Sequence, residues 1–126
     1  MRLYSNRKYP ITFTAVDADG VAATIDGAAS FTVDPPEAGS FRPPNPEVPD
    51  EAGFDPKVTQ ILEINRAYVE THGVPTGIAV AQITATGDAD RGDGVRTLVA
   101  SGAFEFALPE ATAAELVVGD GLPLSA

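Results

Sequence analysis

The sequence predicts an all-β domain in which two antiparallel sheets pack as a sandwich or close as a barrel. Short segments alternate between apolar and polar residues, which is typical of strands with one buried face. Gly, Pro and Asp separate these segments, and no long helical pattern interrupts them. The 126 residues are enough for one core. Because cysteine is absent, disulfides and thiolate metal sites are excluded and folding depends on packing.

Three short strands are expected in the N-terminal part of the chain. Residues 11–16 alternate around Phe13, and the following "DADG" has the composition of a turn. A second strand is expected over residues 21–25. A third contains Phe31 and Val33, which alternate with a threonine.

Four further strands are expected in the C-terminal part. Residues 77–86 are small and apolar on both faces, which favours a central strand covered on both sides. Residues 95–100 and 103–108 alternate in the same way, with a Ser-Gly pair between them. The segment "AELVVG", residues 114–119, is expected to form the last strand before the chain ends.

Residues 56–72 fit two structures. A helix is favoured by Asp55 before Pro56 as a start signal and by Gly73 as a stop signal. Alternation of apolar residues fits two strands joined by a turn equally well. Two strands are preferred here because they would complete the sandwich, but the period alone does not decide.

A proline-rich segment, residues 34–57, separates the two groups of strands. Proline has no N–H for a sheet ladder and fixes φ, so a central strand is excluded and an extended arm is expected. Phe41 and Phe54 are unusual in a flexible linker. Two readings stay open: an ordered arm that places these rings on its own domain or on a neighbour, and a disordered acidic loop. The segment contains seven of the eleven prolines: Pro35, Pro36, Pro43, Pro44, Pro46, Pro49 and Pro56.

The net charge of −10 makes nucleic acid an improbable partner, since a polyanion would be repelled. Residues 1–9 carry a local excess of positive charge from Arg2, Arg7 and Lys8, so they form either a basic arm that docks on an acidic partner or a frayed terminus. Residues 10–126 are expected to form a single domain. The sequence shows no signal peptide and no apolar run long enough to cross a membrane, which predicts a protein made in the cytoplasm without membrane contact.

The acidic stretch "TGDADRGDGVRT", residues 86–97, invites three interpretations. An EF-hand is excluded because, counted from Asp88, Asp93 occupies the glycine position and Val99 the position of the bidentate Glu. A looser calcium site formed by Asp88, Asp90 and Asp93, with Asp17 and Asp19 if the turns meet, is kept as a minor alternative. An Arg-Gly-Asp adhesion signal has no support elsewhere in the chain. We therefore expect a turn between two strands.

No catalytic constellation is recognised, so an enzyme is not expected. His72 is the one histidine, and its neighbours Thr71 and Gly73 form no nucleophile motif. The sequence has neither a phosphate-binding "GxxxxGK" nor a dinucleotide fingerprint. We expect no cofactor and a surface position for His72.

Three pieces of the chain resemble bacterial immunoglobulin-like domains of tailed-phage structural proteins. They are "ITFTAVDADGVAATIDGAASFTV", "ITATGDADRGDGVRTLVASGAFEFAL" and "ATAAELVVGDGLP", which together cover residues 11–33 and 83–123. The resemblance implies an immunoglobulin-like antiparallel β-sandwich with a long Pro-rich insertion, because the match fails at residues 34–57. It also implies a non-catalytic module on the virion.

The resulting expectation is a capsid-decoration or tail-associated protein whose partners are major capsid or tail proteins of the same particle, with a homo-oligomer also compatible. A host-surface or carbohydrate-binding module is the alternative. Aromatic and arginine side chains commonly anchor interfaces. The residues expected to contact the partner come from the N-terminal segment and the proline-rich segment: Arg2, Tyr4, Arg7, Lys8, Tyr9, Phe41, Arg42 and Phe54.

Overall fold

The computed structural model describes residues 1–90, 92, 94–111 and 113–124, and within this range strands predominate, as expected. Two short helical segments interrupt them. In chain order the elements are β1 (Arg2–Tyr4), β2 (Lys8–Thr12), β3 (Ala15–Val16), β4 (Ala22–Ala23), β5 (Asp26–Asp34), η1 (Pro36–Ala38), β6 (Gly39–Arg42), β7 (Thr59–Ile64), α1 (Arg66–His72), β8 (Ile78–Asp88) and β9 (Thr97–Ala107).

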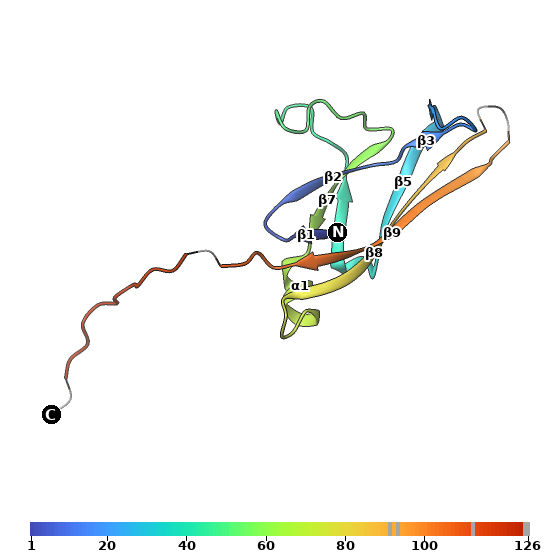
Figure 1. The fold of residues 1–126 in the computed structure, drawn as a ribbon. Helices are drawn as coiled ribbons and strands as arrows, with labels where there is room; N and C mark the ends of the chain where they lie inside the picture. Colours follow the sequence, from blue (N-terminus) through green and yellow to red (C-terminus); the bar gives the residue numbers. More distant parts are fainter. Residues whose placement is uncertain (91, 93, 112, 125–126) are drawn as a thin grey trace.

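The strands form a four-stranded, a three-stranded and a two-stranded sheet (Figure 1). The first has the order β1-β9-β8-β5, in which β8 and β9 form a long antiparallel hairpin, β5 is antiparallel to β8, and β1 is parallel to β9. The second sheet, β2-β7-β6, is antiparallel throughout. A small β3-β4 ribbon completes the arrangement.

The main core lies between the two larger sheets. Phe106 of β9 and Leu62 of β7 are fully buried, and Leu3 of β1 joins them in one cluster with residues of β5, β8 and α1. Because this cluster draws on both sheets, the sheets pack against each other through their apolar faces. A second cluster around Phe13 and Ala85 fills the end nearer the β3-β4 ribbon.

The first nine residues belong to this folded body. β1 pairs with residues 105–107 of β9, and β2 pairs along its whole length with β7. The side chain of Leu3 is only 2% exposed. The structure therefore does not place residues 1–9 in a free arm, because two of the sheets depend on them.

Residues 56–72 contain one strand and one helix, so the preferred two-strand interpretation is wrong for its second half. Strand β7 covers Thr59–Ile64, and Asn65 then caps α1 by accepting a hydrogen bond from the Ala67 N–H through its side chain. Val69 is buried and anchors the helix to the core. Both patterns seen in the sequence are present, one after the other, with Asn65 as the boundary.

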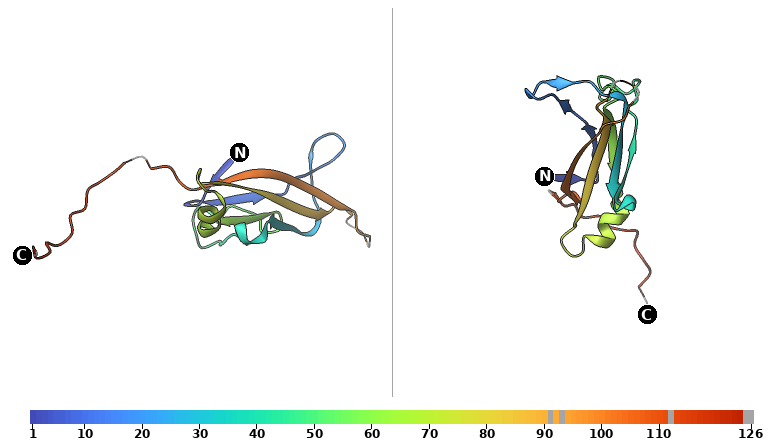
Figure 2. Two further views of the ribbon diagram at one scale, coloured as in Figure 1. Left: turned by 90° about the horizontal axis from the view of Figure 1, so that it is seen from below. Right: turned by 90° about the vertical axis from the view of Figure 1, so that its right-hand side faces the viewer.

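The C-terminal strands differ from expectation in three ways. β9 is continuous through Ser101 and Gly102, where a break was expected. β8 is central, but only its inner face is covered, since Val80 is 64% exposed on the other face. The expected strand over residues 114–119 is absent, because that segment is extended and runs away from the body (Figures 1 and 2).

The proline-rich segment is neither wholly extended nor without structure. It contains η1 and the edge strand β6, which pairs with β7 in antiparallel register. The remainder, residues 43–57, forms successive turns held by backbone hydrogen bonds such as Glu51 N–H to the Val48 carbonyl. In the N-terminal part, the expected strand over residues 11–16 divides into β2 and β3, and the one over residues 21–25 shortens to β4.

Candidate binding groove

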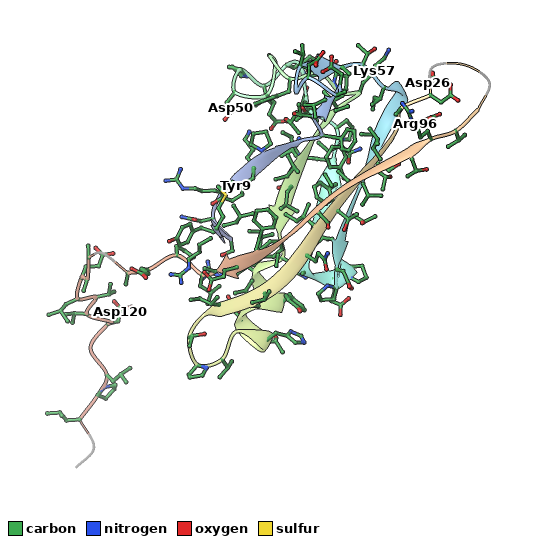
Figure 3. The ribbon with its side chains drawn as sticks, turned by 45° about the vertical axis from the view of Figure 1, so that its right-hand side comes forward. Tyr9, Asp26, Asp50, Lys57, Arg96 and Asp120 are labelled. Carbon is green, nitrogen blue, oxygen red and sulfur yellow. The ribbon has the colours of Figure 1, made fainter. Side chains whose placement is uncertain are left out.

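An open groove of about 730 Å³ forms where the N-terminal residues meet the proline-rich segment. Its walls come from the β1-β2 turn, β2, β7 and the turns after β6. Figure 3 shows Tyr9 and Asp50 on the same side of the molecule, with Asp26 and Arg96 on the other. Six of the lining residues carry the argument that follows: Arg7, Lys8, Tyr9, Asp50, Glu51 and Phe54.

The side chain of Glu51 holds the two segments together. It is 2% exposed, and its Oε1 and Oε2 accept hydrogen bonds from the Arg42 guanidinium at 2.6 and 2.9 Å. Oε2 also accepts from Lys8 Nζ at 2.6 Å, and Oε1 from the Asn45 backbone N–H at 2.9 Å. A buried carboxylate is costly unless paired, and here four donors compensate it.

These contacts shift the pKa values of all three charged groups. The Arg42 guanidinium, then the Lys8 ammonium and the Asn45 N–H, hold the pKa of Glu51 far below its ordinary value of 4.5. Hydrogen bonds to Glu51 and then Glu63 raise the pKa of Arg42. Asp50 and then Glu51 raise the pKa of Lys8 above 10.5. Each shift favours the charged form, so the cluster remains ionised around neutral pH.

Most of the basic residues expected to contact a partner are engaged within the protein. Lys8 binds Asp50 and Glu51, and Arg42 binds Glu51 and Glu63. Arg2 forms an ion pair with Glu105 at 3.5 Å, away from the groove. Arg7 is exposed at the groove and forms no ion pair with any described residue.

Of the four aromatic candidates, Tyr4 is half-buried in β1 and does not line the groove, and the other three differ in environment. The Tyr9 hydroxyl accepts a hydrogen bond from the Tyr4 backbone N–H at 2.8 Å, which fixes its ring on the groove wall. Phe54 lies at the same groove and is 36% exposed. Phe41 instead packs against the core and Phe31, with ring centroids 5.6 Å apart. The structure therefore brings Arg7, Tyr9 and Phe54 together and leaves Arg2 and Phe41 elsewhere.

Glu51 itself was missed by sequence reasoning. Adjacent carboxylates such as Asp50 and Glu51 arise by chance in a chain with 18 acidic residues, so the pair is no signal by itself. No local pattern marks Glu51, because its partner Lys8 is 43 positions away along the chain. The signal available was indirect: two basic residues, Lys8 and Arg42, lie in segments that the fold brings together.

The turn between β8 and β9 uses its carboxylates to organise its own backbone. Asp88 Oδ1 accepts hydrogen bonds from the N–H groups of Asp90 and Arg96, and Asp90 Oδ1 accepts from Gly92. Asp93 and Arg91, named in the calcium and adhesion interpretations, lie outside the described residues. Among those described, no three acidic or histidine side chains gather as a metal site. The turn between two strands is confirmed.

Asp17 has a similar role in the turn between β3 and β4, which borders the same pocket as Ala89 and Arg96 of the β8-β9 turn. Its Oδ1 accepts from the N–H groups of Asp19 and Val21. His72 is exposed at the end of α1, as expected. Its Nδ1 lies 3.1 Å from the Tyr68 carbonyl oxygen, and its ring stacks on that of Tyr68.

Comparisons with known proteins reveal no relative. No family model matches the chain, and neither a curated protein nor a solved structure matches it. Within the described residues, no helix has both the length and the apolar character required to cross a bilayer. The groove is therefore interpreted from its own residues.

Proposed function

We propose that this protein is a non-catalytic structural component of a tailed-phage particle, an immunoglobulin-like module that attaches to the capsid or tail surface. The resemblance of residues 11–33 and 83–123 to such domains suggests this class. The observation that carries the proposal is the groove, which joins the N-terminal and proline-rich segments into one surface around Glu51.

The groove suits a partner that is held by surface complementarity and undergoes no chemical reaction there. The ion pairs of Glu51 already hold its two walls in place before any partner arrives. Binding to such a surface loses little conformational entropy, which favours affinity from a modest contact area. A structural protein that must occupy a fixed place on a particle benefits from this rigidity.

The chemistry of the groove favours a protein partner. Tyr9 and Phe54 offer aromatic surface, and Arg7 adds a cation without an internal partner among the described residues. Aromatic and arginine side chains are the types that most often anchor protein interfaces. We therefore expect the particle to present an apolar side chain beside a carboxylate or carbonyl group to this groove.

The test is attachment to particles. The wild-type protein should copurify with intact particles at a fixed stoichiometry. Phe54→Ala and Arg7→Glu should each lower occupancy at least about tenfold, as expected when an interface anchor is lost. Point variants are preferred to deleting residues 34–57, since that deletion would also remove β6 and Glu51.

Arg96→Glu is the matched control, because Arg96 is exposed on the other side of the molecule (Figure 3). This variant should attach as the wild type does. Equal occupancy for all variants would remove the groove as the contact. Absence of the protein from particles would remove the proposed function.

A further inference from the structure

The end of the chain has the composition of a strand but no neighbour in the described structure. Leu116 is 98% exposed, and Val117, Val118, Leu122 and Leu124 are also almost fully exposed. Large apolar side chains gathered in one exposed segment generally mark a contact surface. The β-branched run Val117–Val118 favours an extended conformation.

The strand-forming part of this tail is residues 113–119. Beyond it, Gly119 and Gly121 flank Asp120, and Pro123 lacks the N–H that a sheet ladder needs. A strand that starts after residue 112 therefore ends naturally near residue 119. Seven residues in extended conformation span roughly 23 Å.

The four-stranded sheet has an uncovered edge of matching length. β1 pairs with β9 only at residues 105–107, so residues 97–104 have no neighbour on that side within the described chain. The Glu105 N–H donates to the Met1 carbonyl and the Ala107 carbonyl accepts from Ser5 N–H, so odd-numbered residues face this edge. By the two-residue period of a strand, Thr97, Val99, Ser101 and Ala103 direct both backbone groups outward there.

Other sheet edges are less suited to accept a strand. β2 carries Pro10 at its centre, which lacks a backbone donor, and β6 is only four residues long. β5 has an irregular register after Asp26, and the Ala29 N–H is already bonded to the Lys57 carbonyl. The edge of β9 is regular and lacks these protections.

Apolar side chains flank the β9 edge on both faces of the sheet. Val99 is 63% exposed on the outer face. Ala100 points to the inner face but is also exposed, and Phe104, which follows Gly102 on the same face, is only half-buried. An added strand would place alternate side chains over both faces, so Leu116 and Val118 would cover one and Val117 the other.

We propose that residues 113–119 of one copy add as a strand to residues 97–104 of β9 in a second copy. The tail leaves β9 at the end that β1 covers and runs away from the uncovered edge (Figures 1 and 2). A second copy is favoured as the occupant because every copy carries both the edge and the strand. If each copy adds its tail strand to the β9 edge of the other, a closed twofold dimer forms in which both edges and both tail strands are paired. This inference does not depend on the proposed attachment to particles.

The first test is the oligomeric state of the full chain, measured by sedimentation equilibrium over a range of concentrations. The wild type should form dimers. The double variant Leu116→Asp with Val118→Asp should raise the dimer dissociation constant at least about tenfold for each apolar side chain returned to water. The control Leu122→Asp with Leu124→Asp adds the same two charges at apolar residues of similar exposure outside the strand and should dimerise as the wild type does.

The second test is complementation between two defective chains. Ser101→Pro removes an outward donor of the β9 edge without touching the hydrogen bonds to β8, and circular dichroism should show that it folds. Neither this edge variant nor the Leu116→Asp with Val118→Asp variant should dimerise alone. Mixed together they should form a heterodimer, because one chain supplies an intact tail and the other an intact edge.

Three outcomes would overturn the proposal. A wild type that stays monomeric at high concentration would show that the tail does not bind a second copy. A mixture that forms no heterodimer, although the wild type dimerises and each variant alone is monomeric, would show that the tail of one copy does not pair with the β9 edge of another. A tail variant that still dimerises would mean that copies meet through another surface, such as β9 against β9.

Discussion

Glu51 shows how one side chain can connect distant parts of the chain. Its carboxylate binds Lys8 of β2 and Arg42 at the end of β6, and so it joins the N-terminal and proline-rich segments. Only the carboxylate is buried, since the side chains of Lys8 and Arg42 are 35% and 37% exposed, so it is the loss of a cation that would leave a buried charge short of a partner. The groove therefore depends on Glu51 for its shape. Because this side chain is only 2% exposed, it offers a ligand little surface to contact.

Glu51→Gln should lower the free energy of unfolding at neutral pH, as measured by urea denaturation, because Lys8 and Arg42 lose their buried counter-ion. The pKa of Glu51 is depressed in the folded state, so its contribution is present above its ordinary value of 4.5 and is lost as the pH falls below it. Between about pH 5 and pH 2 the wild type should thus lose stability more steeply than the variant. Glu47→Gln changes an exposed side chain in the same segment. Its free energy of unfolding should follow that of the wild type at both neutral and acidic pH.

At the scale of elements, α1 shows how a short helix is stabilised by its surroundings. Seven residues are too few for an isolated helix to be stable in water. Asn65 caps its start, Val69 is buried in the core, and the Gly73 N–H donates to the Val69 carbonyl at its end. The chain then turns directly into β8, so the end of α1 and the start of β8 lie close together around Gly73.

Gly73→Ala should destabilise the protein because its Cβ would lie 2.7 Å from both the Val69 oxygen and the Ile78 nitrogen. These are backbone atoms, so relief requires the helix end and β8 to separate, at a cost of about 1–3 kcal/mol. Gly53→Ala is the control, since no atom lies within 4 Å of the added Cβ. It should leave the unfolding free energy unchanged or raise it by about 0.4–1 kcal/mol. Equal effects from the two substitutions in thermal or urea unfolding would refute this account of the turn.

For the whole molecule, the first strand completes the larger sheet. β1 lies parallel to β9, so the first and the last strand of the fold are neighbours in one sheet. Leu3 lies in the same buried cluster as Phe106 and Leu62, between the sheets. The N-terminal segment therefore contributes to global stability, whereas residues 109–111 and 113–124 lie outside the core (Figure 2).

Leu3→Ala should reduce the free energy of unfolding by about 2–5 kcal/mol, the usual range for a leucine removed from a core. Leu124→Ala makes the same change at a side chain that is 99% exposed and should alter the value by less than about 0.5 kcal/mol. Chemical denaturation of both variants in parallel gives the comparison. A value for Leu3→Ala as small as that for Leu124→Ala would mean that residues 2–4 are a detached arm after all.

The sequence alone determined that strands predominate, where most of them lie, and that the chain reverses direction between β8 and β9. These properties follow from local chemistry: alternation specifies a strand, and Asp and Gly specify a reversal. For the groove, it identified Arg7, Lys8, Tyr9 and Phe54 as residues of interest, but it did not identify the carboxylate that joins their segments.

Tertiary structure decided what depends on distant neighbours. It separated residues 59–72 into β7 and α1. The apolar pattern of this segment fits both a helix and strands, and the burial of Val69 and the cap at Asn65 favour the helix in its second half. It committed Lys8 and Arg42 to Glu51, which no spacing along the chain could indicate. It also left residues 114–119 without a partner in the described fold, since a strand pattern records a preference for pairing but not which edge satisfies it.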